Sequence, residues 1–130
     1  MADKILVFGN FLVKQDAVPI KLIPRLQEMF EDIEFIELDP TEDLQNYGRD
    51  LKIIDCVTDI DEVKKIKLET EGDFEKLELG KVYSMHDFDL GYNLKLLRKM
   101  EMIDRVEIIC VPMNIEEEEA FNQIQLILRK

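Results

Sequence analysis

Short apolar runs alternate along this chain with segments whose apolar residues recur at helical spacing. Residues 5–8 form a continuously apolar run, which is typical of a strand covered on both faces of a parallel sheet. Further strands are predicted at 33–38, 51–57 and 105–111. Helical stripes cover 18–30, 89–102 and the stretch that begins at 114. The alternation predicts a three-layer α/β/α fold with a twisted, mostly parallel sheet.

The remaining segments give weaker signals. Residues 63–70 predict a short edge strand, whose lysines would discourage pairing with another chain. Residues 39–48 predict a short helix or a loop, and 71–80 predict a loop. Asn114, followed three positions later by Glu117, predicts a capping box at the start of the last helix.

Composition limits the possible partners. The 130 residues are enough for a single domain, expected to span residues 1–130. A net charge of −12 opposes binding to nucleic acid and, taken alone, would suit a basic peptide or protein. Cys56 and Cys110 lie in apolar runs, which is typical of core residues in a reduced, cytoplasmic protein. No signal peptide or membrane-spanning run is apparent, so membrane insertion is not expected.

Three polar side chains follow or end apolar runs: Asp16, Asp55 and His86, the single histidine. Because sites in parallel sheets form outside the carboxyl ends of the strands, we expect these residues to meet in one cleft. Each also has a structural explanation. Asp16 could cap a helix, Asp55 could hold a loop, and His86 could be an ordinary loop residue. Together, two carboxylates and one imidazole can bind a borderline divalent metal such as nickel or zinc.

Other site types lack the residues they need. A dinucleotide fold requires a glycine-rich turn after the first strand, where only Gly9 is present, and no phosphate-binding Gly-Lys-Ser/Thr motif occurs. A receiver-like domain would carry an acidic pair at the position of Gly9 and Asn10. A nucleophile paired with His86 would have to be Ser84 or a core cysteine, and neither has a supporting motif.

The polar positions lie in three motifs that resemble those of the nickel–iron hydrogenase maturation endopeptidases. The motifs are GNFLVKQD at residues 9–16, IIDCVTD at 53–59 and SMHDFDL at 84–90. They occur in the family's order and span nearly the whole chain. The last motif is most similar to the branch that processes formate-hydrogenlyase-type and related energy-converting hydrogenases.

The resemblance implies a phosphorylase/hydrolase-like α/β/α fold and removal of a C-terminal extension from a nickel–iron hydrogenase large-subunit precursor after nickel insertion. Asp16, Asp55 and His86 would be the catalytic and metal-contacting residues. They would contact nickel carried by the substrate, so no tightly bound cofactor is expected. Gln15 replaces a usual acidic residue, and residues 39–43 replace a glycine-rich segment. A non-cleaving relative that binds a hydrogenase subunit, or an unrelated flavodoxin-like binding module, is therefore the alternative.

Overall fold

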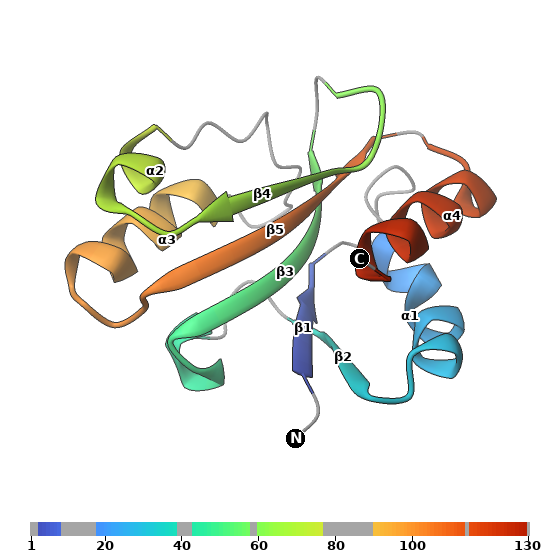
Figure 1. Ribbon diagram of the computed structural model, residues 1–130, viewed down its shortest axis with the longest axis horizontal. Helices are drawn as coiled ribbons and strands as arrows, with labels where there is room; N and C mark the ends of the chain where they lie inside the picture. Colours follow the sequence, from blue (N-terminus) through green and yellow to red (C-terminus); the bar gives the residue numbers. More distant parts are fainter. Residues whose placement is uncertain are drawn as a thin grey trace.

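The computed structural model describes residues 3–8, 18–38, 43–57, 60–76, 90–113 and 115–129 (Figure 1). Within these ranges five strands form one sheet, and helices pack on both of its faces. The strands are β1 (Asp3–Val7), β2 (Ile33–Glu37), β3 (Asp50–Val57), β4 (Lys64–Leu68) and β5 (Arg105–Pro112). The helices are α1 (Val18–Met29), the 3₁₀ helix η2 (Leu44–Tyr47), α2 (Glu71–Glu75), α3 (Leu90–Lys99) and α4 (Glu117–Leu128).

The sheet has the strand order β2-β1-β3-β5-β4. β1 pairs in parallel with β2 and β3, and β3 pairs in parallel with β5. β4 runs antiparallel to β5 at one edge. The predicted mostly parallel sheet is therefore confirmed, and so is the predicted edge strand.

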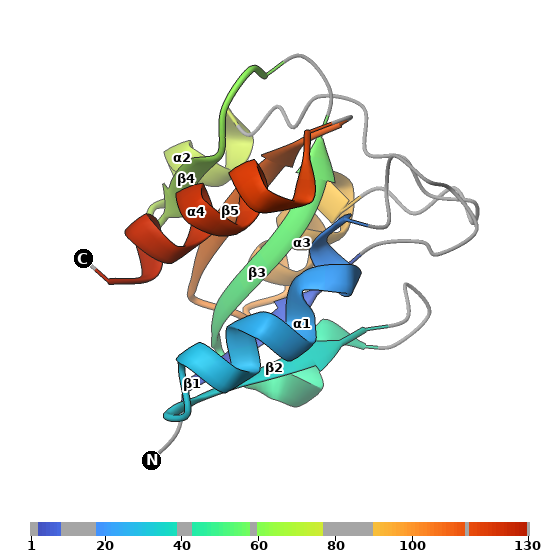
Figure 2. The same ribbon diagram turned by 90° about the vertical axis from the view of Figure 1, so that its right-hand side faces the viewer.

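Two apolar cores lie on opposite faces of the sheet. α1 and α4 cover one face, while α2 and α3 cover the other (Figure 2). Alternate residues of β3 divide between them: Ile53 belongs to the core under α3, and Ile54 to the core under α1. Both cysteines are buried, and they form no disulfide with each other. This layering confirms the predicted α/β/α architecture.

α3 ends earlier than predicted, at Lys99 rather than near Met102. The backbone N–H of Met102 donates to the carbonyl of Leu97 at 3.0 Å, and that of Glu101 donates to Arg98 at 3.1 Å. Glu101 has a φ of 58°, in the left-handed region. These are the two hydrogen bonds and the conformation of a Schellman motif, which satisfies the last helical carbonyls and ends the helix.

Two local predictions were wrong. Part of the loop predicted at 71–80 is the helix α2, whose N-cap residue Thr70 forms a capping box with Asp73. The capping box predicted for the last helix is also wrong. The N-cap residue of α4 is Glu116, and its side chain makes no capping hydrogen bond. The acidic first turn of α4 is present as predicted, where the helix dipole favours negative charge.

Within the described ranges, no helix has the length and apolar character needed to cross a bilayer.

Candidate functional site

The parallel strands β1, β3 and β5 end at the same edge of the sheet, which we call the carboxyl edge. Phe8 follows β1 there, and its backbone N–H donates to the carbonyl of Ile54 in β3 at 2.9 Å. α1 and α3 each end a few residues before the start of a parallel strand, at the other edge of the sheet. Both helices therefore begin on the side of the carboxyl edge. This is the edge at which sites form in parallel α/β sheets.

Asp55 lies near the end of β3, the central strand of the sheet. Its side chain is 2% exposed, and among the described residues it is the single charged side chain that is fully buried. Its Oδ1 accepts a hydrogen bond from the backbone N–H of Cys56 at 2.9 Å. A carboxylate withdrawn from water to this extent is costly unless other groups stabilise its charge. Asp55 is therefore an unusual residue for a sheet interior.

The alternation of β3 places Asp55 on the face that α3 covers. Ile53 and Val57, two residues before and after it, belong to the same core as Leu90 and Leu94 of α3. On the neighbouring strand its register partner is Cys110. Asp55 therefore lies on the face of the sheet that α3 covers, beside β5 and near the end of β3.

Cys110 remains a protonated thiol in these surroundings. Burial, and secondarily the negative charge of Asp55, raises the pKa of Cys110 from 9.0 to about 12. The thiolate is the form that attacks substrates and binds metals. Cys110 is therefore neither a nucleophile nor a thiolate ligand at neutral pH, in keeping with its predicted role as a core residue.

Asp16 and His86, the other two predicted site residues, lie outside the described residues. Their nearest described neighbours in sequence are placed at the carboxyl edge. α1 begins at Val18, two positions after Asp16, and α3 begins at Leu90, four positions after His86. Among the described residues no three potential metal-binding side chains form a cluster. The three-residue site therefore stays a prediction.

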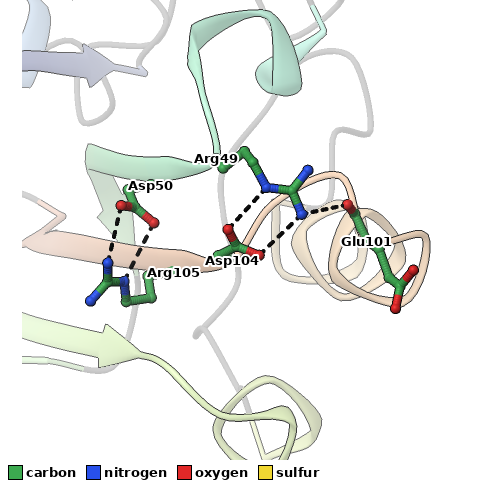
Figure 3. A network of polar contacts seen from close by, with 5 residues as sticks. All are labelled: Arg49, Asp50, Glu101, Asp104 and Arg105. Carbon is green, nitrogen blue, oxygen red and sulfur yellow. Dashed lines mark hydrogen bonds and ion pairs between the residues drawn. The ribbon is translucent and has the colours of Figure 1, made fainter.

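A separate polar network ties together the opposite, amino edge of the sheet (Figure 3). Arg49 Nε donates to Asp104 Oδ2 at 2.9 Å, and Arg105 pairs with its register partner Asp50 at 3.3 Å. Hydrogen bonding and charge attraction from Arg49 lower the pKa of the Asp104 carboxyl. Both ion pairs are exposed and join the starts of β3 and β5, so they contribute to the fold. No sequence motif indicated them, because their partners are far apart in the chain.

No protein-family model and no curated protein matches this chain in sequence. Its fold is similar to that of solved hydrogenase maturation peptidases. The [NiFe] hydrogenase maturation protease HybD from Thermococcus kodakarensis superposes with a TM-score of 0.62 and 20% identity, over 99% of this chain and 98% of that one. The hydrogenase 2 maturation peptidase from a Thaumarchaeota archaeon gives a TM-score of 0.60 and 19% identity, over 98% and 96%. The resemblance predicted from the motifs is thus confirmed at the level of the fold.

Proposed function

We propose that this protein takes part in hydrogenase maturation as an endopeptidase. It would remove the C-terminal extension of a nickel–iron hydrogenase large-subunit precursor after nickel insertion. The observation that carries the proposal is Asp55, a buried carboxylate at the carboxyl edge of the central strand. Asp55 lies in a fold that is similar to two solved maturation peptidases over 98–99% of this chain. The motifs that contain Asp16 and His86 supply the other two proposed contacts.

In this mechanism the substrate brings the metal. Asp55, together with Asp16 and His86, would grip nickel already bound in the precursor and so place the adjacent peptide bond in the site. A metal held in this way can polarise the scissile carbonyl or lower the pKa of a bound water. Asp55 is suited to the task because a buried carboxylate gains more from a nearby cation than an exposed one does. The imidazole of His86 would add a nitrogen donor that nickel favours.

Processing of a nickel-loaded precursor, followed by mass spectrometry, tests the proposal. The wild type should release the C-terminal extension. Asp16→Asn, Asp55→Asn and His86→Ala should abolish release while keeping the circular dichroism spectrum of the wild type. Each change removes one contact to the substrate nickel and retains a side chain of similar or smaller size.

Two acidic substitutions serve as controls. Glu117→Gln alters an exposed residue in the first turn of α4. The Oε1 of Glu117 lies 4.0 Å from the Nζ of Lys21. Asp59→Asn alters a residue of the second motif that takes no part in the proposed mechanism. Both variants should process the precursor as the wild type does. A wild type that binds the precursor and leaves it uncut would instead establish a non-cleaving binding protein. Site variants that cut at the wild-type rate would show that the three residues are wrongly assigned.

A further inference from the structure

An apolar stripe runs along the outer face of α3 and ends at Met100, the residue that follows the helix. Tyr92, Leu96 and Met100 follow one another at intervals of four residues and are 66%, 41% and 53% exposed. Side chains at this spacing lie above one another on a helix. Of the other described large apolar residues, Met29 and Leu126 alone are comparably exposed, and both lie on helices of the opposite face. Exposed apolar side chains that gather on one helix are typical of interaction sites.

The stripe borders a hollow between α2 and α3, which we call the α2–α3 groove. The two helices lie side by side on the same face of the sheet (Figure 1). The hollow has a volume of about 390 Å³ and includes Tyr92 and Leu96 in its lining. Phe74 of α2 also lines it and is otherwise buried in the core. A hollow of this size accepts large side chains of a partner.

Basic side chains line the α3 side of the groove. They are Lys95, Arg98 and Lys99, and no carboxylate of the described residues forms an ion pair with any of them. The guanidinium of Arg98 lies 5.6 Å from the centre of the Phe74 ring. Its Nε is buried and makes no hydrogen bond within the part of the chain that the structure describes. The positive charge of the guanidinium attracts a partner carboxylate to this wall of the groove.

The α2 side of the groove has the opposite charge. Glu71 and Glu75 lie there, so a carboxylate brought to that wall would be repelled. A partner therefore fits in one orientation, with its acidic side chains along α3 and its apolar side chains over Phe74. The groove thus favours acidic side chains at its α3 wall and opposes them at its α2 wall.

We propose that the α2–α3 groove docks an acidic segment of a partner protein through an aromatic or aliphatic anchor. The argument is charge complementarity: α3 contributes three basic side chains and no acidic one, in a chain whose net charge is −12. Overall charge would favour basic partners, so an acidic ligand is a specific consequence of this surface. Amphipathic segments commonly bind in such grooves through apolar anchors.

The groove is placed to act together with the candidate site. α3 begins at the carboxyl edge, where Asp55 lies, and runs away from it along the same face. A segment bound beside α3 therefore belongs to a protein that can also reach the carboxyl edge. That this protein is the hydrogenase precursor rests on the proposed function, whereas the preference of the groove for an acidic segment does not.

Binding of two synthetic peptides, measured by fluorescence anisotropy, tests the proposal. One carries Leu and Phe at helical spacing with Glu at the remaining positions, and its counterpart carries Lys in place of Glu. The acidic peptide should bind the wild type, and added salt should weaken it. Leu96→Glu and Lys99→Glu should each weaken it about tenfold or more, because they remove an apolar contact or reverse a charge.

Matched controls separate the groove from general effects of charge. Leu126→Glu makes the same chemical change on α4, and Lys67→Glu reverses a charge on β4, so both should bind the acidic peptide as the wild type does. The proposal is overturned if the acidic peptide does not bind. It is also overturned if the lysine peptide binds the groove equally well, or if the controls lose as much affinity as the groove variants.

Precursor processing then distinguishes this proposal from the proposed function. If both hold, Leu96→Glu should raise KM for the nickel-loaded precursor and leave kcat near that of the wild type, because docking and cleavage use different residues. An acidic peptide that binds the groove of a protein that cuts no precursor would support the docking site and contradict the peptidase. Cleavage with an unchanged KM in Leu96→Glu would contradict precursor docking in the groove and support the peptidase.

Discussion

Asp55 places a buried carboxylate near the end of β3, and among the described residues it belongs to no cluster of three potential metal-binding side chains. Its cross-strand neighbour Cys110 is held as a thiol, because burial and the charge of Asp55 raise the pKa of Cys110. The proposed set of Asp55, Asp16 and His86 therefore has only oxygen and imidazole donors. A site with no thiolate and only three protein ligands binds divalent metals with modest affinity. Such an affinity suits a metal that arrives with the substrate.

The first prediction concerns removal of metal. Dialysis of the purified protein against a chelator should leave its activity on nickel-loaded precursor unchanged, because the nickel belongs to the substrate. Metal analysis after dialysis should find far less than one nickel per chain, and excess nickel should bind the wild type more tightly than Asp55→Asn. Stoichiometric metal that survives the chelator would instead indicate a conventional metalloenzyme.

The pair Arg49–Asp104 gives a prediction about pH. Arg49 lowers the pKa of the Asp104 carboxyl from its ordinary value of 3.8, so the pair stabilises the fold at pH values above 3.8. This contribution is lost as the pH falls through the lowered pKa. Arg49→Gln should move the pKa of Asp104 back toward its ordinary value, as seen by NMR titration of the carboxyl carbon. Lys52→Gln, which removes the pairing with Asp3, should leave Asp104 unchanged.

The C-terminal end of α3 makes a prediction at the scale of one element. Glu101 adopts the left-handed conformation that its Schellman motif requires, at a steric cost that glycine does not have. Glu101→Gly should therefore raise the free energy of unfolding by about 0.5–1 kcal/mol, since the relief of strain exceeds the added entropy of the unfolded chain. The backbone carbonyl that accepts from Arg49 at 2.7 Å is retained.

Urea denaturation measures this effect. Lys99→Gly, inside the last turn of α3, is the matched control and should lower the stability by about 1 kcal/mol, because glycine there has only its entropic cost. A Glu101→Gly variant that is less stable than the wild type would show that the Glu101 side chain makes a contribution larger than the strain of its backbone.

The described strands and the three longer helices were predictable from the sequence, and the short helix α2 was not. The apolar runs and helical stripes located β1, β2, β3, β5 and the three longer helices, and a weak alternation located the edge strand β4. α2 was missed because its five residues include one buried apolar side chain, Phe74, and no periodic stripe. The signal that could have found it is the capping pair of Thr70 and Asp73. At α4 a similar pair, Asn114 and Glu117, misled the prediction because the helix begins three residues later, at Glu117.

At the scale of the whole molecule, the candidate site was predictable in part. Asp55 interrupts an apolar run, so its burial in a strand could be foreseen, and the parallel topology placed it at the carboxyl edge. Its neighbour Cys110 could not be identified, because strand register depends on contacts between distant segments. The α2–α3 groove could not be predicted either, since it requires a helix that the sequence pattern did not reveal. Asp16 and His86 remain predictions outside the described residues.

The open edge of the sheet gives the last prediction. β4 is an edge strand, and Lys64 and Lys67 are exposed along it. Charged side chains at such edges prevent a second chain from pairing with the free backbone groups. Lys64→Val together with Lys67→Val should therefore cause concentration-dependent self-association in sedimentation analysis, since valine also favours strands. The change makes the net charge more negative than −12, which by itself would oppose association.

Lys95→Gln together with Lys99→Gln removes the same charge from α3 without adding apolar surface and controls for it. This variant should stay at the association state of the wild type, because a helix offers no free strand edge. Lys65 is retained in both variants, so its ion pair with Glu107 at 3.4 Å continues to hold β4 against β5. If the β4 variant also stays at the association state of the wild type, these two lysines do not protect the edge. Neighbouring segments of the chain would then have to cover the free backbone groups of β4.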